Sequence, residues 1–360
     1  MAVFYVLLFV PIVIQHFSVK GLKKTDLSKE KKNNIALTFF FLLLTVLVMF
    51  RHETVGNDTQ NYVYFFNRFS KMDWEDLTND NLETGFVFFN KTVSQFSKDS
   101  RFFLAVSAVA ICTLLYVLYK RLCIDPSLTI VLFCTMSTFV MLFSGIRQML
   151  AVGIGVIAYG FVRKKRPLIF LLLVLLAMSF HTSAMMLIVM YPLYHAKITK
   201  NWMYAVIPLL FVTFVFNKQI FSVLGTILNR YTSYDTMITQ TGAYTMLILF
   251  GIFVIFTFLI PDEAKMDEET IGLRNFLLFS MAIQMFAPLH TIAMRMNYYY
   301  IIFIPLLIPK IIECRSDKWK QIAVVGRHVM VIFFLAYFFI SASGGGGLHV
   351  FPYHFFWENV

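Results

Sequence analysis

Four arginines could bind a phosphate group: Arg51, Arg147, Arg230 and Arg295. Arg147 and Arg295 each stand almost alone among apolar residues, where a charge is costly unless it serves a function. A guanidinium presents planar, paired donors that match phosphate oxygens, so several on one face would form a clamp for a pyrophosphate. The alternative for each is an arginine that snorkels to a membrane surface and binds nothing.

A histidine supplies candidate acid–base chemistry. His181 lies in the polar island Ser179–Ser183, inside a mostly apolar stretch. Histidine exchanges protons near neutral pH and is the commonest general base. The alternative is a histidine at a helix end that is hydrogen-bonded to the backbone or to neighbouring hydroxyls.

Asp58 is the second acid–base candidate, because its carboxylate could position or deprotonate a sugar hydroxyl. The alternative is that Asp58 or Thr59 caps a short helix. The aromatic side chains of that helix would then form an apolar stripe lying on the membrane. The stripe would contain Tyr62, Phe65, Phe66 and Phe69.

Several acidic residues share the same segment, namely Asp73, Glu75, Asp76 and Glu83. Their spacing leaves open a divalent metal site, although short acidic clusters are common in solvated loops. The four cysteines are scattered and indicate neither disulfides nor zinc. No nucleotide-binding or hydrolase motif is present, so we expect no cofactor and, on the favoured interpretation, no metal.

Composition identifies the scaffold that must position these residues. The chain has 360 residues, of which 59% are hydrophobic and 14% charged, whereas a soluble domain is about 25% charged. This excludes a soluble enzyme, a disordered chain and a secreted disulfide scaffold. An integral membrane protein with room for roughly 10–12 helices follows from about 20 residues per span. The spans must be helical because backbone groups in lipid need partners within their own segment.

The apolar runs predict an all-α, polytopic bundle of about 12 spans, organised as a single membrane domain over 1–360. The predicted spans are roughly 2–18, 35–50, 102–119, 128–143, 146–162, 167–180, 181–194, 203–222, 243–260, 273–290, 296–312 and 322–341. The stretch 167–194 is either one long tilted helix or two short helices that meet near His181. The first span lacks a cleavage site and is expected to be retained.

Charge sets the predicted orientation. Clusters of lysine and arginine lie between alternate spans, and the positive-inside rule assigns these loops to the cytoplasm. Both termini and three longer segments, the loops 51–101 and 217–242 and the tail 342–360, then lie outside. Because topology accounts for the net charge of +11, nucleic acid is not an expected partner.

Short motifs along nearly the whole chain resemble the EpsG family of bacterial polysaccharide biosynthesis proteins, which are Wzy-like polymerases. The matching stretches are Phe50-Arg51, Val55–Tyr62, Glu83–Phe86, Ile146–Gln148 with Ala151, Phe180–Ala184, Arg295–Tyr299 and Phe351–Tyr353. The family often has threonine where Asn57 stands, a departure that touches none of the charged candidates.

The resemblance implies a glycosyltransferase of O-antigen or exopolysaccharide biosynthesis. Such enzymes act at the outer, periplasmic face of the bacterial inner membrane. They transfer a growing glycan from its undecaprenyl pyrophosphate carrier to the non-reducing end of another lipid-linked repeat unit. The implied partners are the lipid-linked oligosaccharide, membrane lipid and a chain-length regulator.

The resemblance also organises the candidate residues. Arg51, Arg147, Arg295 and Arg230 would bind the carrier pyrophosphate. His181 or Asp58 would activate the acceptor hydroxyl, and Glu83 would hold a sugar hydroxyl or orient an arginine. Sugar rings would contact tyrosines, namely Tyr62, Tyr298 and Tyr299.

Two other functions stay open at this point. A flippase for lipid-linked oligosaccharide would place charges along a central path, whereas most charges here gather at one face. A metal-dependent membrane glycosyltransferase would use the acidic cluster of the first outer loop.

Overall fold

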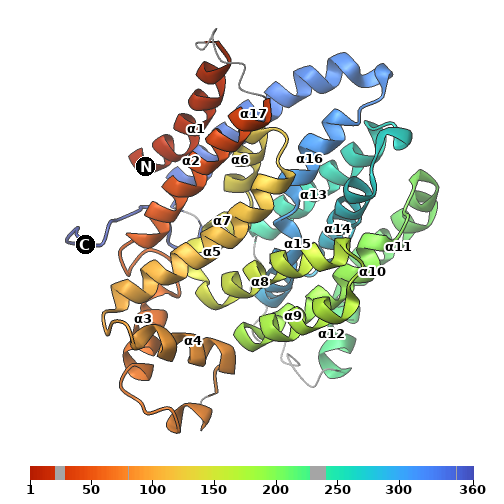
Figure 1. The fold of residues 1–360 in the computed structure, drawn as a ribbon. Helices are drawn as coiled ribbons and strands as arrows, with labels where there is room; N and C mark the ends of the chain where they lie inside the picture. Colours follow the sequence, from red (N-terminus) through yellow and green to blue (C-terminus); the bar gives the residue numbers. More distant parts are fainter. Residues whose placement is uncertain (21–28, 80, 228–240, 346) are drawn as a thin grey trace. The chain divides into compact units, whose positions relative to one another are not determined.

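The computed structural model describes residues 1–20, 29–79, 81–227, 241–345 and 347–360 (Figure 1). Within these ranges the regular structure is helical, and β-pairing is limited to isolated bridges between Arg51 and Phe355 and between Pro261 and Arg315. The all-α class predicted from composition is therefore confirmed.

The chain forms two compact units. The first comprises Met1–Ile188 and Val325–Val360, and the second comprises Val189–Val324. The first unit contains α1 (Ala2–Lys20), α2 (Lys29–Met49), α3 (Thr59–Phe69), η1 (Asp76–Asn79), α4 (Thr84–Ser94), α5 (Ser100–Leu122), α6 (Pro126–Thr135), α7 (Ser137–Ser144), α8 (Ile146–Arg163), α9 (Pro167–Phe180) and, but for Val189, η2 (Thr182–Val189).

The second unit is also built of helices. It contains α10 (Met190–His195), η3 (Lys200–Trp202), α11 (Met203–Val215), α12 (Asn217–Ile227), α13 (Thr241–Leu259), η5 (Glu263–Lys265), α14 (Glu268–Gln284), α15 (Thr291–Ile301), α16 (Ile304–Glu313) and η6 (Asp317–Trp319). The last helix, α17 (Lys320–Ser343), belongs to the first unit from Val325 onward.

Aspartates and prolines mark where several helices begin. Asp99 accepts a hydrogen bond from the Arg101 amide, and Asp267 accepts one of 2.7 Å from the Thr270 amide. These caps satisfy amides that have no partner inside the helix. Pro126 and Pro167 stand in the first turns of α6 and α9, where a missing amide hydrogen costs nothing.

Each predicted span coincides with helical residues, but three of them are broken. The pair α6–α7 is bent by 64°, Lys200–Val215 with Asn217–Val223 by 78°, and α15–α16 by 45°. Four described helices are long and apolar enough to cross a membrane, or up to seven segments if each bent pair is one span. About 12 spans are therefore not confirmed. Among the described residues, Ala2–Gln15, Asn33–Met49 and Pro167–Phe180 are apolar helices of fewer than 18 residues, so they fall short of that length.

The stretch 167–194 is divided at His181. Helix α9 ends at Phe180, His181 has extended backbone with φ −159°, and the chain continues as the 3₁₀ helix η2 and then α10. Of the two alternatives left open by the sequence, the structure shows two helical stretches that meet at this histidine.

Two short helices, α3 and α4, lie in the segment predicted as an outer loop (Figure 1). The helix expected after Asp58 is confirmed as α3. Its aromatic stripe lying on the membrane is wrong, because Tyr62, Phe66 and Phe69 are buried. Phe66 stacks on Phe103 of α5 with ring centroids 4.9 Å apart, so packing against the bundle uses this apolar face.

The turn between α5 and α6 joins three other helices of the first unit. Asn33 of α2 donates to the Ile124 carbonyl at 2.9 Å, and Gln15 of α1 accepts from the Ser127 hydroxyl at 2.5 Å. Arg327 of α17 forms a paired salt bridge with Asp125, in which Nη2 lies 2.8 Å from Oδ1. This turn ties helices from both ends of the chain together.

Arg327→Leu should lower the free energy of unfolding by about 2 kcal/mol, because it leaves the half-buried Asp125 carboxylate without its cation. Denaturant unfolding in detergent measures the change. Arg121→Leu, at an exposed position of the same turn region, is the matched control and should differ little from wild type. Equal stability of the two variants would show that the ion pair contributes nothing.

Candidate active site

Glu83 is the centre of a cluster of three ionisable side chains in the first unit. Its Oε2 lies 2.6 Å from Arg147 Nη1, and its Oε1 lies 3.1 Å from His181 Nδ1. The Thr182 amide also donates to Oε1 at 3.3 Å. The structure therefore brings together residues separated by 64 and 98 positions in the chain.

The backbone directs the Glu83 carboxylate away from its own helix. Glu83 precedes α4 with extended backbone and makes no side-chain capping bond, so its oxygens are available to α8 and α9. Gly85 permits this approach: a Cβ there would lie 2.3 Å from Ser179 Oγ and 2.8 Å from the Ser179 carbonyl oxygen. Only glycine lets α4 reach the end of α9 so closely.

Arg147 lies in the first turn of α8, just after the break at Gly145. Its guanidinium sits over the Phe86 ring at 5.7 Å and interacts with the hydroxyl of Tyr62. The side chain is 22% exposed, although its Nε is buried without a partner among the described residues. The arginine is thus held in place by Glu83, Phe86 and Tyr62 while part of it stays accessible.

Glu83 is ionised in this arrangement. Burial raises the pKa of its carboxyl, but the hydrogen bond from His181 and the charge of Arg147 outweigh burial and lower the pKa to about 2. A carboxylate can only accept hydrogen bonds, so Nδ1 of His181 must carry the hydrogen that lies between them. In the neutral imidazole, Nε2 then holds the lone pair, which is the form required of a general base.

Tyr62 and Asp58 lie close to this cluster. Tyr62 is buried, and burial raises the pKa of its hydroxyl. The positive charge of Arg147 lowers this pKa, whereas the negative charge of Asp58 raises it, and the net shift is upward. Asp58 precedes α3 but makes no side-chain capping bond, and its amide donates to Ser144 Oγ at 3.3 Å. The carboxylate is therefore not used as the helix cap that the sequence allowed.

Arg51 is the most deeply buried of the predicted phosphate ligands that the structure describes, with 2% of its surface exposed. Its Nη1 donates to the Val48 carbonyl, while Nε and Nη2 have no partner among the described residues. Burial lowers the pKa of this guanidinium to about 10, so the side chain stays charged at neutral pH. Tyr353 and Tyr62 interact with the same charge.

The remaining predicted site residues lie in the second unit or outside the described residues. Arg295, Tyr298 and Tyr299 lie on α15 of the second unit, where the arginine is exposed and both tyrosines are buried. Arg230 falls outside the described residues. Their convergence on one pyrophosphate with Arg147 stays a prediction.

Charged residues inside predicted spans were overlooked in the sequence, among them Arg327 in 322–341 and Arg274 in 273–290. Arg274 of α14 is completely buried, bonds both oxygens of Glu263 at 2.5 and 3.2 Å, and donates to the Ile198 carbonyl at 2.6 Å. Its guanidinium also sits over Phe258 at 4.1 Å. The cost of a charge at this depth was the signal that could have found it.

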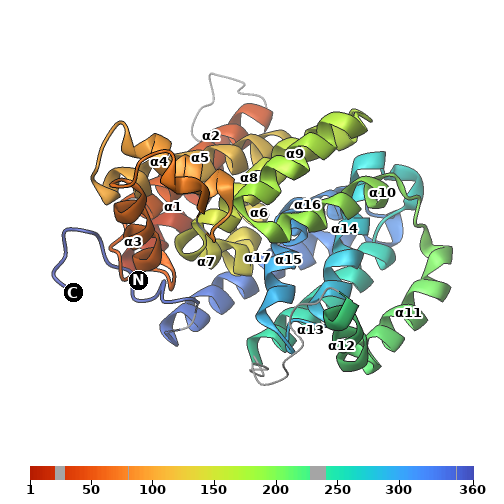
Figure 2. The same cartoon turned by 90° about the horizontal axis from the view of Figure 1, so that it is seen from below.

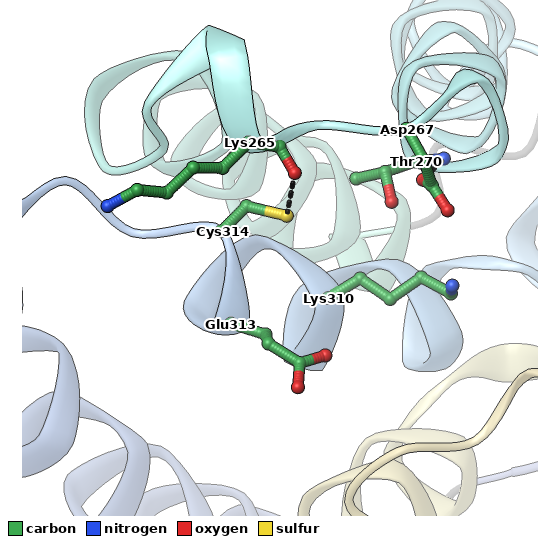
Figure 3. A pocket seen from close by; sticks show the side chains of 6 residues that line it. All are labelled: Lys265, Asp267, Thr270, Lys310, Glu313 and Cys314. Atoms are coloured by element: carbon green, nitrogen blue, oxygen red, sulfur yellow. Dashed lines mark hydrogen bonds between the residues drawn. The ribbon is translucent and has the colours of Figure 1, made fainter.

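A polar cavity of about 240 Å³ lies in the second unit (Figure 3). Its lysines are already paired, since Lys310 Nζ lies 3.3 Å from Glu269 and Lys265 lies near Asp262 and Asp317. Burial raises the pKa of the Cys314 thiol, which interacts with the Lys265 carbonyl at 3.3 Å. A thiol that holds its proton is a poor nucleophile, so this cavity is a weaker candidate for catalysis.

The described acidic residues of the segment predicted as the first outer loop are not grouped as metal ligands. Asp73, Glu75 and Asp76 are exposed, and within the described ranges no group of three or more His, Cys, Asp or Glu side chains could hold a metal ion.

The described residues form helices, several of them long and apolar enough to cross a membrane, and hold a partly exposed Arg–Glu–His cluster. The protein is therefore an all-α membrane protein. The EpsG family matches residues 34–355, and the chain belongs to that family. Membership confirms the resemblance drawn from the short motifs and supports a polymerase-like role in membrane polysaccharide biosynthesis. Neither a curated protein nor a solved structure matches the chain.

Glu83 should stabilise the fold in a pH-dependent way. Its pKa of about 2 in the folded state lies below the ordinary 4.5, so the stabilisation is fully present above about pH 4.5 and is lost as the pH falls toward 2. The difference in Tm between wild type and Glu83→Gln should therefore shrink over that acidic range. Thermal unfolding in detergent from pH 2 to 7 measures it.

Glu53→Gln, at an exposed position preceding α3, is the control and should follow wild type across the range. A difference between wild type and Glu83→Gln that grows on acidification would contradict a carboxylate stabilised by Arg147 and His181.

Proposed function

We propose that this protein polymerises lipid-linked oligosaccharide repeat units. It would transfer the glycan of one undecaprenyl pyrophosphate carrier to the non-reducing end of another, at the outer face of the bacterial inner membrane. The observation that carries the proposal is the bond of one carboxylate, Glu83, to both a partly exposed arginine and a histidine. Membership of the EpsG family supports it.

His181 is the proposed general base. Glu83 fixes the hydrogen on Nδ1, so Nε2 can accept the proton of an acceptor sugar hydroxyl. The carboxylate then stabilises the imidazolium that forms, as a third group does in catalytic triads. The side chains of His181 and Glu83 are 12% and 14% exposed, which shields the pair from bulk water without closing it off.

Arg147 is the proposed ligand of the departing pyrophosphate. A guanidinium has five N–H donors; Glu83 and Tyr62 engage part of this set, and the remainder can bind phosphate oxygens. Arg147 also lies at the N-terminal end of α8, where unpaired amides and the helix dipole favour negative charge. Donors fixed before the reaction are most effective where charge develops.

The step can be written with every atom assigned. The acceptor O–H bond breaks as its proton passes to His181 Nε2, and the oxygen bonds to the anomeric carbon of the donor glycan. The bond from that carbon to the carrier phosphate breaks, and its electron pair leaves on the pyrophosphate facing Arg147. The anomeric carbon passes through an oxocarbenium-like state.

The other candidate residues have supporting roles in this proposal. Arg51, Arg295 and Arg230 would add charge to the pyrophosphate site, and Asp58 would orient the acceptor. Tyr62, Tyr298 and Tyr299 were predicted to contact sugars. All three are buried, and their contact with sugars stays part of the proposal. Tyr62 in addition holds Arg147, with which its hydroxyl interacts. The reaction proposed needs no metal or cofactor, and the membrane topology of about 12 spans belongs to the same proposal.

Purified protein incubated with a defined lipid-linked repeat unit tests the function directly. A ladder of products on a gel is the expected result. The absence of products longer than one repeat unit, with folded protein and intact substrate, would overturn the proposal. Unchanged product lengths in EDTA would separate this enzyme from a metal-dependent glycosyltransferase.

Arg147→Ala should reduce turnover by at least 10²-fold, as expected for removal of a donor that stabilises developing charge. Arg147→Lys should rescue poorly, because an ammonium cannot replace the guanidinium toward both Glu83 and phosphate. The assay is the rate of ladder formation at equal amounts of folded protein. Arg166→Ala, in an exposed turn, is the control, and wild-type chain lengths in Arg147→Ala would refute the clamp.

His181→Ala should lower kcat by about 10²- to 10⁴-fold, the range for loss of a general base. The residual rate should rise with pH, because hydroxide can replace the missing base. His195→Ala removes a histidine from the second unit and should retain turnover. A His181→Ala enzyme with the kcat and pH profile of wild type would exclude His181 as the base.

A further inference from the structure

The C-terminal tail, residues Leu348–Phe356, is bonded along the segment that leads into α3. The His52 amide donates to the His354 carbonyl at 2.8 Å, and the Phe356 amide donates to the Phe50 carbonyl at 3.0 Å. Between these residues, Arg51 forms an antiparallel bridge with Phe355. The tail is thus paired with the chain on both sides of a predicted phosphate ligand.

A second set of bonds holds the loop just before Asp58. The Gly56 amide donates to the His349 carbonyl at 3.1 Å, and the Asn57 amide donates to the Leu348 carbonyl at 3.0 Å. Leu348 and His349 have φ values of 55° and 56°, a left-handed conformation that costs energy for residues other than glycine. The surrounding contacts maintain this costly geometry where the tail meets the loop.

The same loop is fixed on its other side to the break before Arg147. Thr59 Oγ1 donates to the Phe143 carbonyl at 3.1 Å, and the Asp58 amide bonds Ser144 Oγ at 3.3 Å. Gly56 has φ +90°, and a Cβ there would lie 2.3 Å from the Phe143 carbonyl oxygen. The loop is therefore packed between the tail and the residues that start α8.

Aromatic contacts anchor the tail to the bundle; Figure 2 shows the course of its backbone to the C-terminus. Phe351 packs on Phe4 of α1 with ring centroids 4.9 Å apart, and Arg101 of α5 lies 4.7 Å from the centre of the Phe356 ring. The Tyr353 hydroxyl donates to the Leu47 carbonyl at 2.8 Å and interacts with the buried charge of Arg51.

We propose that the C-terminal tail positions the active site, with Leu348, His349 and Tyr353 acting as positioning residues for Asp58 and Arg147. The path of contacts is continuous: the tail holds the Gly56–Thr59 loop, the loop holds Phe143 and Ser144, and α8 with Arg147 begins two residues later. This inference rests on the proposed function. Because a misplacement of about 1 Å can cost 10²-fold in rate, a displaced tail should impair turnover without unfolding the protein.

Two substitutions at position 348 test this in the full chain. Leu348→Pro forces φ to about −65° and should release the tail, whereas Leu348→Gly readily adopts the left-handed conformation. We expect Leu348→Pro to lower kcat by at least about tenfold with the KM for the lipid-linked substrate within about twofold, and Leu348→Gly to keep most of the wild-type kcat. Rates are normalised to folded protein, so a merely structural role would leave kcat unchanged.

Tyr353→Phe is the milder second variant. It removes one hydroxyl, and the expected result is a drop in kcat of about threefold to tenfold, in line with one lost hydrogen bond. Thr59→Val disturbs the other side of the loop. If tail and loop act through one path, the fold-decrease in kcat of the double variant Leu348→Pro with Thr59→Val should be smaller than the product of the fold-decreases of the two single variants.

Equal kcat for Leu348→Pro and Leu348→Gly, or wild-type kcat in Tyr353→Phe, would overturn the inference. A wild-type enzyme that forms no ladder would instead refute the proposed function. The two failures are therefore distinguishable in the same assay.

Discussion

The site depends on one partly buried carboxylate that has two side-chain partners. A carboxylate removed from water is unstable unless charges and hydrogen bonds replace its hydration. Glu83 meets this requirement with Arg147, His181 and the Thr182 amide. Because Glu83 bonds Arg147 through Oε2 and His181 through Oε1, it sets the position of the cation and the tautomer of the imidazole together.

This arrangement is possible because the helices of the first unit are interrupted where they meet. Glu83 precedes α4, Arg147 follows the break between α7 and α8, and His181 directly follows α9. Helix ends leave amides and carbonyls without intrahelical partners and can direct side chains across a bundle. An uninterrupted apolar helix over 167–194 would leave no polar turn for His181 and Thr182.

Two arginines show the difference between a structural and a candidate functional charge. Arg274 is fully buried, with two bonds to Glu263, a backbone carbonyl and an aromatic face around it. Arg147 has one bond to its carboxylate partner, a buried Nε without a described partner, and 22% exposure. Both arginines have a buried Nε without a partner among the described residues. They differ in exposure: the Arg274 side chain has no exposed surface, whereas 22% of the Arg147 side chain is exposed and can meet an anion from outside.

The amino-acid sequence by itself determined the helical class, the apolar scaffold, the EpsG family and the residues of the cluster. Composition, local charge and short motifs suffice for these. Only the tertiary structure decided that Glu83 joins Arg147 to His181, that Tyr62 is buried, and that three predicted spans are bent. These features depend on contacts between distant segments, such as Gly85 against Ser179, and the apolar character of a segment does not specify which neighbour it meets.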